Sequence, residues 1–215
     1  MTNFKVEAKY TAKFITFEGG EGCGKSTQSK MLYEYLLSKN VRVIHTREIG
    51  GTIEAEKIRN LLLYSELLPI SELMLVMAAR YEHVNKVILP ALKDNIWVIC
   101  DRFVDSTACY QGQHPLIGIN KVYQLHHENI SDGIMPDITF LLDLPPELAL
   151  QRTIGRKDNN KFEDKKLEFH YKVYEEFQTI AQRFKNRIVK IQVDNLDQSQ
   201  VHQKIVNTLL GSWLS

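Results

Sequence analysis

The chain lacks the features of a secreted, cysteine-ligated or membrane-embedded protein. Its three cysteines, Cys23, Cys100 and Cys109, are odd in number and form no CxxC pair or metal-ligand spacing. Free thiols in a reducing compartment are the simplest interpretation. No stretch approaches the uninterrupted apolar length that crosses a bilayer, and the first dozen residues contain no apolar signal-peptide core. We therefore predict a cytoplasmic protein without a membrane partner.

An excess of charge of one sign is also missing. The 27 Lys and Arg residues nearly balance the 26 Asp and Glu residues, which leaves a formal net charge of +1. Binding along a nucleic acid backbone needs a basic excess, so we predict no nucleic acid partner. No internal repeat, low-complexity tract or Gly/Ser linker divides the chain. We therefore predict one domain over residues 1–215, with residues 1–12 as an N-terminal extension.

Five short apolar runs rich in β-branched residues recur along the chain, at residues 14–17, 41–46, 96–100, 138–142 and 188–193. Most are apolar on both faces, which is typical of parallel strands covered on both sides. The segments between them have helical spacing. One buried helix face is predicted at Leu167, Tyr171, Tyr174, Phe177, Ala181 and Phe184. The alternation predicts an α/β fold: a three-layer, doubly wound parallel sheet of five strands, whose ligands bind beyond the carboxyl ends of the strands.

Residues 19–26, with the sequence GGEGCGKS, follow the first predicted strand and lead into a helix. Glycines permit positive φ and let backbone N–H groups close on phosphate oxygens, while the helix N-terminus adds partial positive charge. We expect Lys25 to reach the β- and γ-phosphates of ATP, and the Ser26 hydroxyl to ligate Mg²⁺. The predicted ATP-binding residues are Gly19, Gly20, Glu21, Gly22, Cys23, Gly24, Lys25, Ser26 and Thr27.

Other P-loop proteins share this loop, so the class of protein must be read from other segments. The guanine-binding motif NKxD has only a near match at residues 120–123 (NKVY), which lacks the carboxylate. Arg47 and Arg102 close two predicted strands, and Arg80 stands in the apolar helical run LMLVMAAR. These three arginines predict a second anionic ligand that meets the nucleotide.

In these motifs the sequence resembles the bacterial thymidylate kinase (dTMP kinase) family. The resemblance covers about residues 14–193 and includes FEGGEGCGKST, TREIGGT, LMLVMAAR, DRFVDSTACYQG and PDITFLLDL. It implies a P-loop nucleoside monophosphate kinase-like fold, and phosphorylation of dTMP to dTDP with ATP and Mg²⁺ by a homodimer, in dTTP biosynthesis. Two other functions stay open: a kinase for another nucleoside monophosphate or a deoxynucleoside, and a non-catalytic nucleotide-binding regulatory protein.

The resemblance also implies roles for the charged residues near the strand ends. Arg47 and Arg102 match the arginines that hold the dTMP phosphate, and Arg80 matches the arginine that hydrogen-bonds the thymine edge. Asp101 matches the carboxylate that supports Mg²⁺. Glu21 matches the acidic position near the sugar 3′-hydroxyl of the acceptor and the metal site.

The base pocket departs from the family pattern at one position. Thr107 and Gln111 lie where polar side chains contact the base, and Tyr110 lies where a ring blocks a 2′-hydroxyl. Val76 stands where the family usually places a phenylalanine that stacks on thymine. Losing such stacking could cost on the order of 1–3 kcal/mol, by analogy with single-strand binding.

The resemblance places a mobile lid over ATP at about residues 151–163 (QRTIGRKDNNKFE). Arg152 and Arg156 recur there at helical spacing. Gly22 stands in the phosphate loop where one subgroup of the family carries an arginine. The catalytic arginine is therefore expected to come from the lid, as Arg152 or Arg156.

Overall fold

The structure is a computed structural model that describes residues 10–152, 162 and 165–213. Five strands form one sheet in the order β2-β3-β1-β4-β5, and every neighbouring pair is parallel. The strands are β1 (Phe14–Glu18), β2 (Val43–Arg47), β3 (Trp97–Asp101), β4 (Ile138–Asp143) and β5 (Ile188–Gln192). The predicted five-stranded parallel sheet is confirmed, with strand ends that shift by one or two residues.

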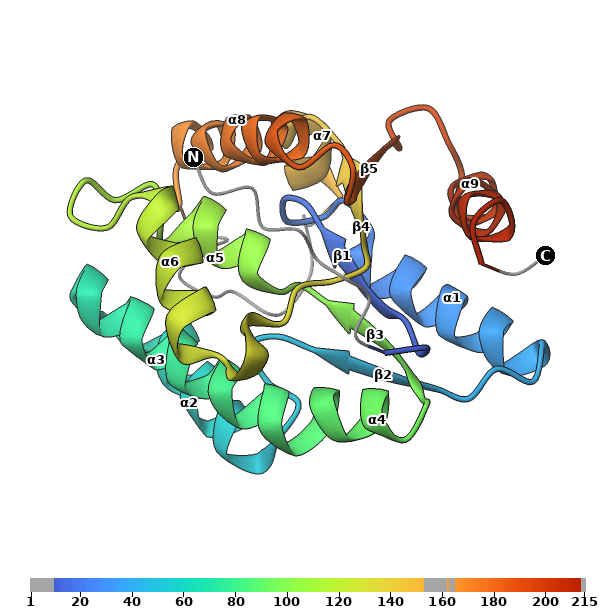
Figure 1. Ribbon diagram of the computed structural model, residues 1–215. Coiled ribbons are helices and arrows are strands. Elements are labelled where there is room, and N and C mark those ends of the chain that lie inside the picture. Colours follow the sequence, from blue (N-terminus) through green and yellow to red (C-terminus); the bar gives the residue numbers. More distant parts are fainter. Residues whose placement is uncertain (1–9, 153–161, 163–164, 214–215) are drawn as a thin grey trace.

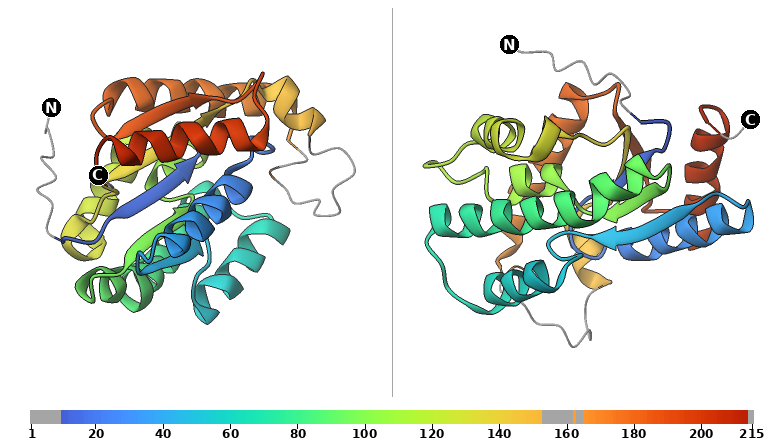
Figure 2. Two further views of the ribbon diagram at one scale, coloured as in Figure 1. Left: turned by 90° about the vertical axis from the view of Figure 1, so that its right-hand side faces the viewer. Right: turned by 60° about the horizontal axis from the view of Figure 1, so that its bottom comes forward.

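Helices cover both faces of this sheet, as Figures 1 and 2 show. One core layer lies under α1 and α9, and the other lies under α3, α4, α5, α6 and α8. None of the helices in the described part of the chain has the length and apolar character needed to span a bilayer. The helices are α1 (Lys25–Ser38), α2 (Ile53–Tyr64), α3 (Pro69–His83), the π-helical turn η1 (Val84–Ile88), α4 (Leu89–Lys93), α5 (Val104–Tyr110), α6 (Ile119–Asn129), the 3₁₀ turn η2 (Ser131–Gly133), α7 (Pro146–Gln151), α8 (Leu167–Arg183) and α9 (Gln198–Leu210).

Burial along the strands follows their place in the sheet. Every residue of the interior strands β1 and β4 is buried, because helices pack on both of their faces. The edge strands β2 and β5 alternate between buried and more exposed positions. The prediction that most strands are covered on both faces therefore holds for the centre of the sheet, and the edge strands are the partly exposed ones.

The buried face of α8 differs from the prediction. Leu167 and Tyr171 are 42% and 37% exposed. Of the six predicted positions only Phe177 is fully buried, and the buried residues of the helix are His170, Val173, Phe177 and Ile180. The prediction assigned the wrong face because it counted only hydrophobic residues, whereas the buried face of α8 includes the polar residue His170.

At the amino end of β3, two tryptophan rings meet edge to face. The centroids of Trp97 and Trp213 are 6.0 Å apart, and the Lys13 ammonium lies 5.0 Å from the Trp213 ring centroid. Asp101, at the other end of the same strand, lies at the cavity described next. The tryptophan pair and this cavity therefore occupy opposite ends of the sheet.

Candidate active site

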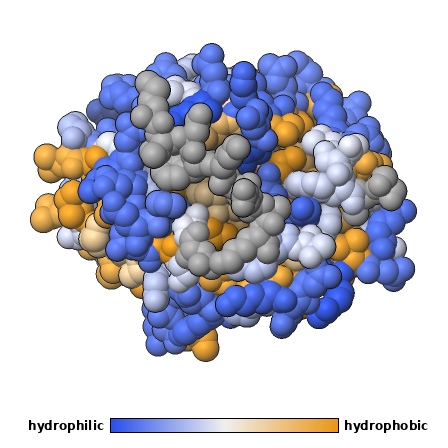
Figure 3. Space-filling view, viewed as in Figure 1, coloured by the Kyte–Doolittle hydropathy of each residue, from blue (hydrophilic) through white to orange (hydrophobic). Residues whose placement is uncertain are grey.

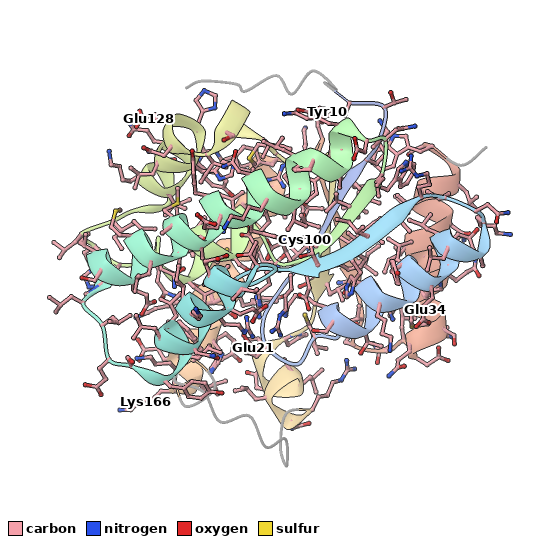
Figure 4. All side chains as sticks on the ribbon, turned by 90° about the horizontal axis from the view of Figure 1, so that it is seen from below. Tyr10, Glu21, Glu34, Cys100, Glu128 and Lys166 are labelled. Carbon is pink, nitrogen blue, oxygen red and sulfur yellow. The ribbon has the colours of Figure 1, made fainter. Side chains whose placement is uncertain are left out.

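A cavity of about 920 Å³ opens at the carboxyl ends of β2 and β3. Its walls come from the phosphate loop, the end of β2, helices α2 and α3, and the segment from β3 through α5. Figure 4 shows Glu21 of the phosphate loop at this place, between α1 and α2. The predicted site residues that line it are Glu21, Gly22, Gly24, Lys25, Ser26, Thr27, Arg47, Arg80, Asp101, Arg102, Thr107, Tyr110 and Gln111.

The phosphate loop needs its glycines for conformation and for space. Gly19 and Gly24 have φ of 137° and 99°, which side chains rarely adopt. A Cβ on Gly19 would lie 2.7 Å from the carbonyl oxygen of Leu142. Helix α1 begins directly after Gly24, so its free N–H groups face the loop. The loop is thus shaped to hold an anion against the start of α1.

Lys25 is folded into this loop. Its side chain is largely buried, and Nζ donates a 2.5 Å hydrogen bond to the carbonyl oxygen of Gly20. Nζ also lies 3.5 Å from the Cys23 sulfur. The predicted loop residues Gly19, Gly20 and Cys23 do not line the cavity wall, but Gly20 and Cys23 hold the lysine that does.

Ser26 and Asp101 meet at the floor of the cavity. The Ser26 hydroxyl donates to Asp101 Oδ2 at 2.5 Å, and Asp101 Oδ1 is buried without a hydrogen-bond partner among the described residues. A hydroxyl and a carboxylate are oxygen ligands of the kind that Mg²⁺ prefers. The described residues contain no cluster of three His, Cys, Asp or Glu side chains that could cage a metal ion. The residues therefore fit Mg²⁺ that takes most of its ligands from nucleotide phosphates and water.

Arg102 ties the cavity to the phosphate loop. Its Nη2 donates to Glu21 Oε1 at 2.6 Å, and its Nη1 donates to the Gly19 carbonyl at 3.0 Å and to the Ser106 hydroxyl at 2.9 Å. Burial disfavours the charged forms of both Arg102 and Glu21, but the opposite charge of the partner stabilises each of them. Glu21 raises the pKa of Arg102 well above its usual range. Arg102 and Lys25 lower the pKa of Glu21 to about 2.

Two more arginines face the same cavity from β2 and α2. Arg47 Nη2 lies 2.8 Å from Glu56 Oε2, and both side chains are substantially exposed. Arg59 was not predicted; it lines the cavity and donates from Nη1 to the Ile49 carbonyl at 3.0 Å. Burial lowers the pKa of Arg59, and the nearby Arg47 charge lowers it further. The sequence did contain an indication of this residue. Arg59 lies at helical spacing with Ala55 and Leu62, and an arginine on an otherwise buried helix face is expected to have a charged or polar partner.

Arg80 lies in a buried polar network at the end of α3. Its Nε donates to Glu48 Oε2 at 2.7 Å, and its Nη2 donates to the Thr107 hydroxyl at 2.7 Å. Glu48 Oε1 also lies 3.0 Å from His83 Nδ1. Burial opposes the Glu48 charge, but Arg80 holds the pKa of Glu48 below its usual value. The Arg80 guanidinium lies 5.0 Å from the Phe103 ring centroid. These contacts fix one edge of the guanidinium and leave the residue on the cavity wall.

The remaining predicted base contacts are also anchored. Tyr110 donates its hydroxyl to Glu21 at 3.2 Å, and Gln111 donates its amide to Glu72 at 2.8 Å. Val76 does not belong to the cavity wall: it is 1% exposed and packs in the core one helical turn before Arg80. The sequence pattern could not tell a buried position from one on the cavity wall here, because Val76 and Arg80 lie on the same side of α3.

The predicted lid falls mostly outside the described residues, including Arg156. Arg152 is described; it is exposed, and its Nη2 lies 3.4 Å from the Val193 carbonyl, away from the cavity wall. Phe162 lines the cavity, and its ring centroid lies 5.7 Å from that of Tyr110 in an edge-to-face contact. An aromatic residue from this region therefore reaches the wall, whereas the described lid arginine does not.

Known proteins are similar to this chain over nearly its whole length. The model of the thymidylate kinase family matches residues 17–205. Thymidylate kinases from Rickettsia africae (strain ESF-5) and Rickettsia bellii (strain RML369-C) are 54% and 52% identical, over 90% and 89% of this chain and 95% and 93% of theirs. A crystal structure of thymidylate kinase from Ehrlichia chaffeensis has a TM-score of 0.74 and 37% identity, and covers 92% of this chain and 98% of its own. With the phosphate loop and the clustered arginines in place, this chain belongs to the thymidylate kinase family.

Proposed function

We propose that the protein phosphorylates dTMP to dTDP with ATP and Mg²⁺, in dTTP biosynthesis. The observation that carries the proposal is the convergence of Lys25 with Arg47, Arg59 and Arg102 on one cavity. Phosphoryl transfer asks a protein mainly to align donor and acceptor and to neutralise charge on the transferred group. The convergence of these four cations on one cavity suits two phosphate-bearing substrates that meet end to end.

The donor half of the site comprises the phosphate loop and the floor below it. The loop N–H groups and Lys25 hold the ATP phosphates. Ser26 and Asp101 would hold Mg²⁺ directly or through its water, and the bound ion would supply positive charge that offsets the charge of the ATP phosphates. The buried Oδ1 of Asp101, which has no hydrogen-bond partner in the described part of the chain, supports this role.

The acceptor half faces it from β2, α2 and α3. Arg47, Arg59 and Arg102 bind the dTMP phosphate in line with the ATP γ-phosphate. Phosphate oxygens then replace the Glu56 carboxylate as the partner of Arg47. An attacking phosphate oxygen is already anionic, so a strong general base is not required. Arg152 or Arg156 completes the charge neutralisation when the lid covers ATP.

The base and sugar contacts follow from the same wall. Arg80, Thr107 and Gln111 supply hydrogen bonds to the thymine edge, and the Tyr110 ring excludes a ribose 2′-hydroxyl. Glu21 acts near the sugar 3′-hydroxyl, and the hydrogen bonds from Arg102 and Tyr110 that orient its carboxylate support this role. Val76 supplies no stacking ring, because it is buried behind the cavity wall.

We further propose that the protein acts as a homodimer and works in the cytoplasm. Ile70, Met74 and Tyr81 are 45%, 46% and 51% exposed and lie on one face of α3, with Leu68 76% exposed just before it. Figure 3 shows apolar surface at the left edge of the molecule, beside the N-terminal end of α3. A second copy would bury this face. The three free, buried thiols support a reducing compartment.

A panel of acceptors in a coupled ADP-release assay tests the function. We expect dTMP to give the highest kcat/KM among dTMP, dUMP, other monophosphates and thymidine, with Mg²⁺ and ATP present. A clear preference for another acceptor would replace dTMP in the proposal. Binding of ATP without acceptor-stimulated ADP formation would favour the regulatory alternative.

A further inference from the structure

A buried carboxylate outside the cavity wall holds the loop that carries Arg102. Glu18 is the last residue of β1 and is 1% exposed. Its Oε1 accepts hydrogen bonds from the backbone N–H groups of Phe103 at 2.7 Å and Ser106 at 3.2 Å. Its Oε2 accepts a 2.5 Å hydrogen bond from the Ser106 hydroxyl. A buried carboxylate is costly unless it is well satisfied, so a structural purpose for these bonds is expected.

The backbone conformation at Arg102 is unfavourable and depends on contacts with neighbouring residues. Arg102 has a φ of 70°, in the left-handed region that residues with a Cβ disfavour. Such a conformation persists only where its surroundings determine it. The N–H of Arg102 donates to the Phe17 carbonyl at 2.9 Å, and the next N–H, that of Phe103, donates to Glu18. Two consecutive residues of β1 therefore hold the peptide groups on both sides of Arg102.

Glu18 also acts on the Arg102 side chain through Ser106. The Ser106 hydroxyl donates to Glu18, and this leaves its lone pairs to accept from Arg102 Nη1 at 2.9 Å. The carboxylate thus sets the direction of the hydroxyl, and the hydroxyl sets one end of the guanidinium. Arg102 is therefore restrained at its main chain and at its tip by the same buried group.

We propose that Glu18 is a positioning residue for phosphoryl transfer: it fixes the turn at Arg102 and, through Ser106, aims the guanidinium at the acceptor phosphate. The inference rests on the proposed role of Arg102 in binding that phosphate. Glu18 does not line the cavity, so we expect it to act without touching either substrate. Its loss should therefore misplace one cation of the acceptor half and leave the donor half intact.

Steady-state kinetics of Glu18→Ala, Glu18→Gln and Ser106→Ala test this inference. We expect Glu18→Ala to raise the KM for dTMP by roughly tenfold or more, the effect of losing hydrogen bonds to a charged group. The KM for ATP should change less than about twofold, because the donor half of the site keeps its hydrogen bonds. Glu18→Gln should recover part of the affinity for dTMP that Glu18→Ala loses, because its amide oxygen still accepts from the Phe103 N–H but its NH2 group cannot accept from the Ser106 hydroxyl. Ser106→Ala should give part of the effect.

Thr16→Ala is the matched control, because Thr16 is fully buried on the same strand and hydrogen-bonds Thr139 at 2.7 Å. It should lower the melting temperature without changing the ratio of the two KM values. Equal changes in both KM values, or a loss of stability alone, for Glu18→Ala would overturn the inference. If Glu18→Ala does not fold, Ser106→Ala decides by the same criterion. Arg102→Ala separates the two proposals: an unchanged KM for dTMP there would refute the role of Arg102 itself.

Discussion

Arg102 and Glu21 form a 2.6 Å ion pair that joins the loop after β3 to the phosphate loop. Both side chains are mostly buried, at 18% and 24% exposed, so solvent screens the pair only in part. The carboxylate neutralises the guanidinium while the acceptor site holds no phosphate. If Arg102 binds the dTMP phosphate as proposed, that phosphate can use the remaining donors of Arg102 while Glu21 keeps the guanidinium paired.

Arg102→Lys tests the geometry of this pair. A lysine keeps the charge but cannot reach Glu21, Ser106 and the Gly19 carbonyl in one planar arrangement. We expect the KM for dTMP to rise about tenfold, the loss typical of one charge-assisted hydrogen bond. Arg42→Lys, at an exposed position before β2, is the control. Similar kinetics for both variants would show that charge alone suffices at residue 102.

Lys25→Met should abolish most phosphoryl transfer. The ammonium is held inside the phosphate loop, where it can follow charge onto the transferred group. We expect kcat to fall about 100-fold or more, as for loss of one preorganised donor to developing charge. Lys30→Met removes the same charge from the exposed side of α1, and it should stay near wild-type activity. Initial rates of ADP formation measure both, and a Lys25→Met variant with normal kcat would contradict the assignment.

Asp101→Asn should weaken Mg²⁺ binding. The neutral amide replaces the carboxylate that meets Ser26 at the cavity floor. We expect the Mg²⁺ concentration that gives half-maximal rate to rise roughly tenfold, within the range seen when groups that orient a metal are altered. A Mg²⁺ titration at fixed ATP measures this shift. Asp94→Asn, at an exposed position after α4, should leave the titration unchanged.

Arg80→Met should destabilise the fold as well as weaken dTMP binding. The Arg80 and Glu48 side chains are 1% and 3% exposed, so the variant leaves a buried carboxylate without its main partner. Breaking such a pair costs about 3–5 kcal/mol of unfolding free energy. Urea unfolding measures the loss, and the double variant Arg80→Met with Glu48→Met should recover part of it. A loss below about 1 kcal/mol would indicate a pair that solvent screens effectively.

The raised pKa of Glu18 leads us to expect that the free energy of unfolding depends on pH. Burial and the nearby Asp105 raise the pKa of Glu18 from 4.5 to about 7. Its contribution to stability is therefore fully present below pH 4.5 and is lost as the pH rises through about 7. Glu18→Gln cannot ionise, so its stability relative to wild type should increase between pH 5 and pH 8.

The quantity to measure is the difference in unfolding free energy between Glu18→Gln and wild type. Burial and the Arg80 charge lower the pKa of His126 to about 4, so its contribution is lost in the opposite direction, as the pH falls. Such terms are common to both proteins and cancel in the difference. A Glu18→Gln difference that is flat with pH, from urea unfolding at several pH values, would refute the raised pKa.

The sequence predicted what depends on local pattern, and missed what depends on packing. Five strands, the phosphate loop and the arginines at strand ends were readable, because each is a short run with its own chemistry. The carboxylate partners were not, since Arg80 meets Glu48 only when α3 packs beside β2. Glu18 was missed for the same reason, because it holds the backbone of Phe103 and Ser106, which lie far along the chain.

The two tryptophans of the chain stand at the end of the sheet farthest from the site, where their rings pack against each other. Their intrinsic fluorescence therefore reports on how the last described residues dock against β3, and it is blind to nucleotide. A substrate titration followed by emission needs an added reporter at the cavity, and Tyr64, exposed on its wall, is a suitable place for an introduced tryptophan. The native pair then becomes an internal reference, which stays constant during binding and changes when the C-terminal end of the fold loosens.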